Sequence, residues 1–323
     1  MRSLVHRRRV VDFLLLLIVN TMWAAQYAAY KTASAKMGPV TLSTWTFVLA
    51  AGALIPVLAL ERRNGAVPTA DPALRSWRRK ENLAGFAIIG ALGLIPASAL
   101  LAWGASLSTA SNASLIYLTV PIITCLLAAM ILGERMSALR WVSLAISLAG
   151  VLLLSGGDLR QARLANPGYL AGNGLVLLAC ASSSFYNVYS KELLKRFTPV
   201  EVLVTGYLIA AAISLPLIVW VEHFSPRDAA GYGLSGWMSL LVLGLMSWGI
   251  AMVLWLRLLT RLDVSQASVS IYLLPFLGVL ISALALGERI TASTAAGGAI
   301  TLAGTLLITL ADSPRGKEKT HAA

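Results

Sequence analysis

Polar and aromatic side chains share one face of an early apolar segment, a pattern suited to binding a small molecule inside a membrane. They occupy positions i, i+3, i+4 and i+7 and are Trp23, Gln26, Tyr27 and Tyr30. The same face recurs 160 residues later as Ser183, Tyr186, Asn187 and Ser190. Amides and hydroxyls in lipid need partners, so we expect the aromatic residues, Gln26 and Asn187 to line a shared cavity. Helix–helix hydrogen bonding, or an aromatic belt at the headgroups, is the alternative.

A symmetric pair of amide side chains, Asn112 and Gln266, lies near the start of two further apolar segments. Tyr117 and Tyr272 follow about one turn later, although the repeat aligns Tyr117 with Ile271. We predict that Asn112, Tyr117, Gln266 and Tyr272 contact a substrate. The alternative is that the amides hold neighbouring helices together.

Two lysines and two prolines stand at positions that favour a role in gating. Lys31 and Lys191 lie near helix ends, where an ammonium group reaches the interface or attracts an anion. Pro121 and Pro275 fall inside apolar segments, and each removes a helix hydrogen bond and kinks the backbone. Snorkelling lysines and static kinks are the alternatives that need no gate.

The pairs Glu134-Arg135 and Glu288-Arg289 each follow an apolar segment, where helix capping and local pairing are the favoured interpretation. The fourteen acidic residues all fall in predicted loops or near the ends of the segments, so no carboxylate is expected at mid-bilayer. Motifs for zinc hydrolysis, dithiol redox chemistry and nucleotide binding are missing from the sequence. We therefore expect neither an enzyme nor a metal or other cofactor.

The elements that carry these residues are membrane spans. Hydrophobic residues make up 58% of the chain, charged residues only 12%, and the mean hydropathy is +0.77. Soluble domains carry about 25% charged residues, and lipid is the solvent that removes that need. The net charge of +12 fits basic cytoplasmic loops better than a nucleic-acid partner. Cys125 and Cys180 lie in apolar stretches and predict buried thiols rather than a disulfide.

Ten segments have the length of about 20 residues that a bilayer demands. They are 11–33, 41–60, 83–106, 110–132, 138–155, 168–194, 200–221, 234–259, 264–286 and 293–311. The chain is thus expected to be an all-α integral membrane protein with ten transmembrane helices. Residues 313–323 are polar and are expected to form a disordered cytoplasmic tail.

Lysine and arginine residues predict the orientation of these spans. With the N-terminus inside, 20 of them fall on the cytoplasmic side and 6 on the other. The positive-inside rule therefore places both termini in the cytoplasm. Low cysteine content and short loops suggest the inner (plasma) membrane of a bacterium.

An internal repeat divides the chain into residues 1–157 and 168–312. Lys31 and Pro39 recur as Lys191 and Pro199, and Pro121 with Gly133-Glu134-Arg135 recurs 154 residues later as Pro275 with Gly287-Glu288-Arg289. Each repeat holds five predicted spans, so the second copy enters the membrane from the opposite side. Two inverted five-helix repeats are the architecture of many secondary transporters.

These repeated motifs carry a family likeness. The chain resembles ten-helix, EamA-type members of the drug/metabolite transporter superfamily, through the doubled Lys-x7-Pro and the doubled Pro-x11-Gly-Glu-Arg. The resemblance covers residues 11–311 and implies export or exchange of metabolites, amino acids or drugs through a cavity between the halves. Family members often carry an arginine beyond the second-span proline, whereas the stretches here read Trp45-Thr46-Phe47 and Thr205-Gly206-Tyr207.

The sequence thus predicts a secondary transporter, an exporter of small metabolites that works by alternating access. Aromatic and amide lining favours an uncharged or zwitterionic substrate with apolar bulk, for which an amino acid is the best candidate. The partners expected are this small molecule and the lipid bilayer, with a homodimer possible and nucleic acid excluded. A channel-like facilitator, or a lipid-handling or scaffold protein without soluble-substrate flux, is the alternative.

Overall fold

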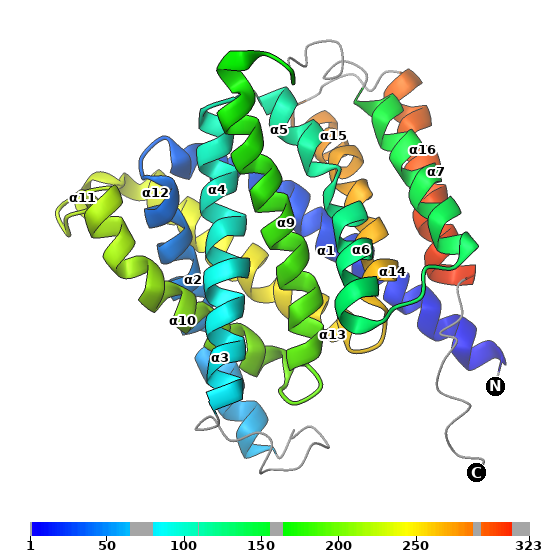
Figure 1. The fold of residues 1–323 in the computed structure, drawn as a ribbon, viewed down its shortest axis with the longest axis horizontal. Helices are drawn as coiled ribbons and strands as arrows, with labels where there is room; N and C mark the ends of the chain where they lie inside the picture. Colours follow the sequence, from blue (N-terminus) through cyan, green and yellow to red (C-terminus); the bar gives the residue numbers. More distant parts are fainter. Residues whose placement is uncertain (1, 65–79, 109, 156–163, 287–291, 312–323) are drawn as a thin grey trace.

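The computed structural model describes residues 2–64, 80–108, 110–155, 164–286 and 292–311. Over these residues every regular element is a helix, and no strand occurs. Figure 1 shows the helices packed side by side into one bundle. The predicted cytoplasmic tail, residues 313–323, lies outside the described residues.

The helices of the first half are α1 (Arg2–Ser34), α2 (Pro39–Arg63), α3 (Lys80–Ile88), η2 (Ile89–Leu94), α4 (Ile95–Ser106), α5 (Ala110–Tyr117), α6 (Val120–Leu132) and α7 (Ala138–Leu154). A short 3₁₀ turn, η3 (Pro167–Tyr169), opens the second half. The helices that follow are α9 (Leu170–Leu193), α10 (Pro199–Val221), α11 (Asp228–Gly231), α12 (Gly233–Leu241), η4 (Val242–Ala251), α13 (Met252–Leu259), α14 (Val264–Ser268), η5 (Val269–Tyr272), α15 (Leu273–Leu286), α16 (Ala292–Leu306) and η6 (Leu307–Ala311).

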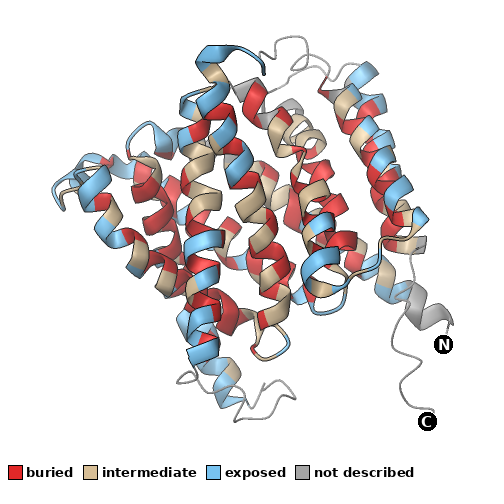
Figure 2. Ribbon diagram, viewed as in Figure 1, coloured by how far each residue is buried: buried red, intermediate tan, exposed pale blue. Residues whose placement is uncertain are grey.

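Eight helices in the described part of the chain are long and apolar enough to cross a membrane. Two further apolar helices, Ala138–Leu153 and Ala295–Leu310, coincide with the fifth and tenth predicted spans but are shorter than the eight. Large apolar side chains on outward faces are well exposed, as Met130 and Trp220 are at 80% and 79%. Figure 2 shows the buried residues gathered where helices face one another. The protein is therefore an all-helical, multi-pass membrane protein.

The prolines of the repeated Lys-x7-Pro motif start helices. Pro39 and Pro199 each occupy the first turn of their helix, α2 and α10, where a missing N–H costs nothing. Thr198 and Glu201 add a capping box at the start of α10, each side chain bonding the other residue's backbone N–H.

The other two prolines, Pro121 and Pro275, each follow an interruption in a span. Pro121 lies in the first turn of α6, after a break that separates this helix from α5. Pro275 lies in the first turn of α15, directly after the 3₁₀ turn η5. Both prolines thus sit where the regular α-helix restarts, and their role in gating stays a prediction.

Two spans contain π-helical segments at matching places in the two halves. Segment η2 interrupts the helix Lys80–Ser106, and η4 interrupts the helix Gly233–Leu259. Each brings a glycine against a facing helix. A Cβ on Gly90 would lie 3.4 Å from the backbone nitrogen of Ala210, and one on Gly244 would lie 3.5 Å from that of Ala50. Wide π-turns of this kind are frequent at functional sites.

Helix contacts are also paired between the halves. Helix α2 packs on α10 and α7 packs on α16, so each helix meets its counterpart in the repeat. Helix α9 packs against α4 and α6. Its counterpart α1 packs in the same way against η4 and α15, which belong to the matching spans of the repeat. Helices α7 and α16 lie side by side in Figure 1 and approach backbone to backbone.

Candidate functional site

Two groups of aromatic side chains, which we together call the aromatic layer, join the two halves of the bundle. Trp255 of α13 is fully buried, and its ring centroid lies 5.2 Å from that of Trp23 in α1. Its indole N–H donates to Oδ1 of Asn187 in α9 at 3.0 Å. The layer thus contains two residues that sequence reasoning assigned to substrate binding, Trp23 and Asn187, together with one that it missed.

The second group of the aromatic layer lies between α2, α10 and η4. Phe47 of α2 and Tyr207 of α10 stack with centroids 5.6 Å apart and an interplanar angle of 11°. Trp248 of η4 packs edge-on against Phe47 at 5.2 Å and donates its indole N–H to the Tyr30 hydroxyl at 2.9 Å. The Tyr207 hydroxyl donates to the Trp248 carbonyl at 2.7 Å.

Phe47 and Tyr207 occupy matching positions, 160 residues apart. They lie in the two stretches where relatives of the resembled type often carry an arginine. In this chain the matching positions bring two rings together instead of a charge. The signal for this ring pair is therefore present in the sequence, at the two positions where an arginine is missing.

Two further residues of the predicted cavity face, Tyr186 and Gln26, lie within the described part of the structure. Tyr186 is buried in α9, and Gln26 is half-buried in α1. The side chains of Tyr27 and Lys31 lie outside the described part of the structure. Substrate contact by these residues stays a prediction.

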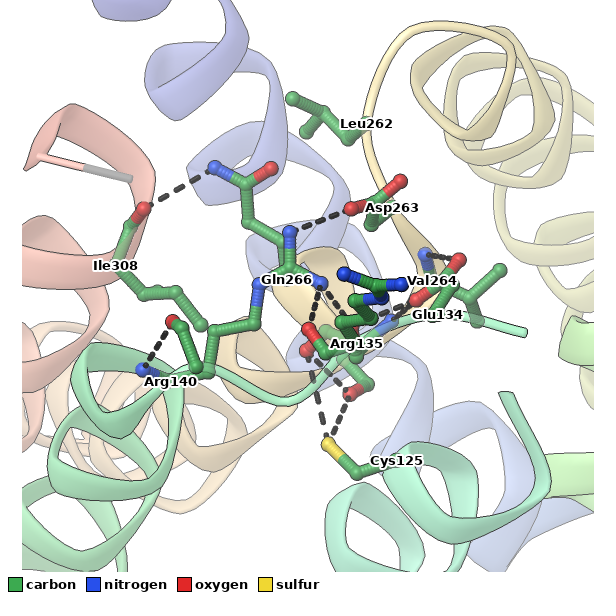
Figure 3. Close-up of polar contacts among 12 residues, drawn as sticks. Cys125, Glu134, Arg135, Arg140, Leu262, Asp263, Val264, Gln266 and Ile308 are labelled. Atoms are coloured by element: carbon green, nitrogen blue, oxygen red, sulfur yellow. Dashed lines mark hydrogen bonds and ion pairs between the residues drawn. The ribbon is translucent and has the colours of Figure 1, made fainter. Parts of the chain in front are cut away.

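The symmetric amides make hydrogen bonds between chain segments. Asn112 Nδ2 donates to Ser108 Oγ at 3.1 Å and to Asn173 Oδ1 at 3.2 Å, and Asn173 belongs to α9. Gln266 Nε2 donates to the carbonyl of Ile308 in η6 at 3.1 Å (Figure 3). These bonds are what the helix-packing alternative expects. Contact of either amide with a substrate stays a prediction.

The two tyrosines paired with these amides differ from each other. Tyr272 is buried and donates its hydroxyl to the carbonyl of Leu118 at 3.1 Å, across the break between α5 and α6. Tyr117 is half-buried at the end of α5. The bond from Tyr272 ties one interrupted span to the other.

At one end of the bundle, a carboxylate caps a helix from another part of the chain (Figure 3). Glu134, which follows α6, accepts hydrogen bonds from the backbone N–H groups of Val264 and Ser265 at 2.8 and 3.0 Å and from the Ser265 hydroxyl at 2.6 Å. Lys191 Nζ lies 3.1 Å from the same carboxylate. Glu134 therefore joins α6, α9 and α14.

A second ion pair adjoins this cap. Arg140 of α7 is buried and donates to the Asp263 carboxylate at 2.5 Å, to Ser265 Oγ at 2.9 Å and to the Arg135 carbonyl at 3.3 Å. Lys191 Nζ reaches Asp263 at 3.4 Å and the Leu262 carbonyl at 2.7 Å. Burial alone would raise the pKa of Asp263, but the hydrogen bond from Arg140 and the charges of Lys191 and Arg140 outweigh it and lower that pKa.

We call the five residues Glu134, Arg140, Lys191, Asp263 and Ser265 the helix-end network. Of these, sequence reasoning selected Lys191 as a gating residue and Glu134 as a cap. It missed Arg140 and Asp263, because charged residues at helix ends are common and their pairing depends on the packing of α7 against the loop before α14.

An all-helical bundle with apolar outward faces and polar groups buried between its helices is compatible with a membrane transporter. The model of the EamA-like transporter family matches residues 12–156 and again residues 170–310. The chain belongs to this family, which confirms the resemblance read from the repeated motifs. It is a membrane transporter and not an enzyme.

Relatives with assigned names agree with this class. A probable terminal-alkyne amino-acid exporter of Streptantibioticus cattleyicolor is 29% identical over 91% of this chain and 91% of its own. The uncharacterized transporter YoaV of Bacillus subtilis is 24% identical over 92% of this chain and 96% of its own. One solved crystal structure, 23% identical, has a TM-score of 0.73 and covers 94% of this chain and 98% of that one, which shows the shared fold.

Proposed function

We propose that the protein is a secondary transporter that exports a small metabolite by alternating access. The proposal includes ten transmembrane helices in two inverted five-helix repeats, residues 1–157 and 168–312. The observation that carries it is the aromatic layer, because its side chains come from both halves and meet where the halves contact. A site shared by two halves is what a rocking motion can expose to either side.

The pairing of helix contacts supports the inverted repeat. Helices α2 and α10 meet each other, as do α7 and α16, which is expected of counterparts that lie beside a twofold axis. The two shorter apolar helices belong to this second pair and supply the fifth and tenth spans of the proposal. The odd number of spans per repeat then requires the halves to enter the membrane from opposite sides.

An amino acid with apolar bulk is the substrate class that we propose. Rings of Trp23, Phe47, Trp248 and Trp255 offer apolar contact, and the Asn187 amide offers hydrogen bonds. The relative from Streptantibioticus cattleyicolor, named as a probable exporter of terminal-alkyne amino acids, supports the same class. Export as the direction rests on that relative and on the family.

The count of basic residues supports a plasma-membrane protein with both termini in the cytoplasm. By this orientation the helix-end network lies on the cytoplasmic side. Small residues of α7 and α16 pack these two helices against each other within one chain, so they give no support for a homodimer.

Binding of the substrate class can be tested without transport. A bound ligand stabilises the folded state, so the purified protein should unfold several degrees higher in the presence of a saturating amino acid. We expect this rise with large apolar amino acids such as leucine or tryptophan and not with glutamate or lysine. Asn187→Ala and Trp23→Ala should reduce the rise.

The control is Lys195→Gln, which removes an exposed ion pair with Glu192 and should leave the rise unchanged. No shift with any amino acid would remove this substrate class. A shift that survives both Asn187→Ala and Trp23→Ala would place binding elsewhere.

A further inference from the structure

We propose that the helix-end network is a gate that closes one end of the transport path, and that its Arg140–Asp263 pair makes this end the one closed at rest. The inference rests on the alternating-access function proposed above. It is carried by the contacts of the network and by the way these residues are distributed between the two repeats.

The network gathers on one short segment, Arg261 to Ser265, which covers the end of the loop after α13 and the start of α14. Arg261 pairs with Asp12 of α1 at 3.1 Å, and the Leu262 carbonyl accepts from Lys191 of α9 at 2.7 Å. Asp263 pairs with Arg140 of α7. With Glu134 on the backbone of α14, this segment holds α1, α6, α7 and α9 together, and these helices come from both halves.

Burial makes these contacts strong enough to matter. The side chains of Arg140 and Glu134 are only 6% and 7% exposed, and those of their partners Asp263 and Lys191 are 35% and 23% exposed. Both members of an ordinary surface pair, Lys195 and Glu192, are more exposed, at 63% and 38%. Exposed pairs contribute little, whereas breaking a buried pair leaves a charge without compensation. Separation of the helices at this end therefore requires the network to come apart.

One part of the network is repeated in the sequence. Glu134 and Ser265 correspond to Glu288 and Ser111 at an offset of 154 residues, and Lys191 corresponds to Lys31 at an offset of 160. A carboxylate, a serine and a lysine are thus provided in each half, as a carrier that closes alternately at its two ends requires.

The other part occurs once. The positions that correspond to Arg140 and Asp263 in the sequence are Thr294 and Thr109, and threonine carries no charge with which to form an ion pair. The end that contains Arg140 and Asp263 consequently has an ion pair that the matching positions of the repeat cannot form. In a two-state equilibrium, a contact made in only one state shifts the population toward that state.

Cysteine labelling in membrane vesicles tests this gate without any substrate. Cys125 and Cys180 are first replaced by serine, and a reporter is placed inside the gate by Ser190→Cys. Ser190 is fully buried and lies next to Lys191 in α9. A second reporter, Ser43→Cys in α2, is almost fully buried and lies at the opposite end of the bundle. A membrane-impermeant maleimide is then added to inside-out and right-side-out vesicles.

Arg140→Gln and, separately, Asp263→Asn should raise the labelling rate of the Ser190→Cys reporter by about threefold to tenfold. The same variants should lower the rate of the Ser43→Cys reporter, because opening one end closes the other. Arg140→Lys, which keeps the charge, should restore most of the original rate. Lys195→Gln, just after the end of α9, should change neither rate.

An unchanged rate at the Ser190→Cys reporter would overturn the proposal. A parallel rise at both reporters would also overturn it, because it would indicate loosened packing rather than a shifted equilibrium. Labelling needs no substrate, so a negative result leaves the binding and transport tests unaffected. Conversely, failure of those tests leaves the labelling result interpretable.

Discussion

Carboxylates of this protein cap helices that belong to other parts of the chain. Glu134 caps α14, and Glu222 at the end of α10 accepts from the backbone N–H groups of Val40 and Thr41 in α2 at 2.7 and 2.8 Å. A helix N-terminus carries partial positive charge and unpaired N–H groups. A carboxylate there neutralises the charge and accepts hydrogen bonds from the N–H groups. In a bundle with few charges, such caps fix how two helix ends meet.

The cap on α2 predicts that Gly38 cannot be enlarged. Its backbone has ordinary extended angles, but a Cβ at this position would overlap the Glu222 carboxylate. We expect Gly38→Ala to displace that carboxylate and to cost about 1–2 kcal/mol of stability, by the loss of charged cap bonds. Thermal unfolding in detergent measures the cost.

The matched control is Gly52→Ala in the same helix, where an added Cβ meets nothing within 4 Å. It should be neutral or slightly stabilising, because alanine favours the helix. Equal unfolding temperatures for the Gly38→Ala and wild-type proteins would show that the cap contributes no stability.

The lowered pKa of Asp263 predicts an acid-dependent contribution. A carboxyl group whose pKa is lower in the folded than in the unfolded protein stabilises the fold at pH values above its ordinary pKa of 3.8. This stabilisation is lost as the pH falls through the pKa that the group has in the folded protein. Wild type should therefore unfold at a higher temperature than Asp263→Asn at pH 7. The difference should shrink only below about pH 4. A difference that already vanishes between pH 7 and pH 5 would contradict this assignment.

At the scale of elements, hydropathy predicted the long helices well because lipid imposes length and apolarity on each span. It could not predict the π-helical segments η2 and η4, since local sequence does not encode a wide turn. Those turns are accommodated by tertiary contacts, as at Gly90 against Ala210. For the same reason the aromatic layer was only half predicted: Trp23 and Asn187 stood out by spacing, whereas Trp248 and Trp255 lay in uniformly apolar stretches.

The contact of α7 with α16 depends on glycine. A Cβ on Gly150 would lie 2.6 Å from the Thr301 nitrogen and 2.8 Å from the Gly297 carbonyl oxygen. Backbone atoms cannot yield as a side chain can, so Gly150→Val should separate the two helices and destabilise the protein by about 2–4 kcal/mol. Thermal unfolding in detergent, together with elution as a single species in size-exclusion chromatography, provides the measurement.

Gly174→Val in α9 is the matched control for that substitution. A Cβ there meets nothing within 4 Å, and the position is exposed, so the variant should behave as wild type within about 1 kcal/mol. If both valine variants lose the same stability, the cost belongs to valine in a membrane helix rather than to the α7–α16 contact.

At the scale of the whole molecule, the two halves share their aromatic layer but differ at their ends. Phe47 and Tyr207 meet as counterparts, whereas Arg140 and Asp263 have threonines as counterparts. For the exporter proposed above, the symmetric ring pair gives both states of the carrier the same contact, and the asymmetric ion pair makes one state more stable. A carrier that binds on one side and returns to a defined resting state needs both features.

Exchange in proteoliposomes tests the central claim, alternating access, most directly. Uptake of labelled leucine is measured with and without unlabelled leucine preloaded inside. Alternating access predicts saturable uptake that accelerates on preloading and falls at least tenfold in Asn187→Ala protein that still folds. Uptake that rises linearly with concentration and ignores preloading would contradict a carrier and indicate a channel-like facilitator.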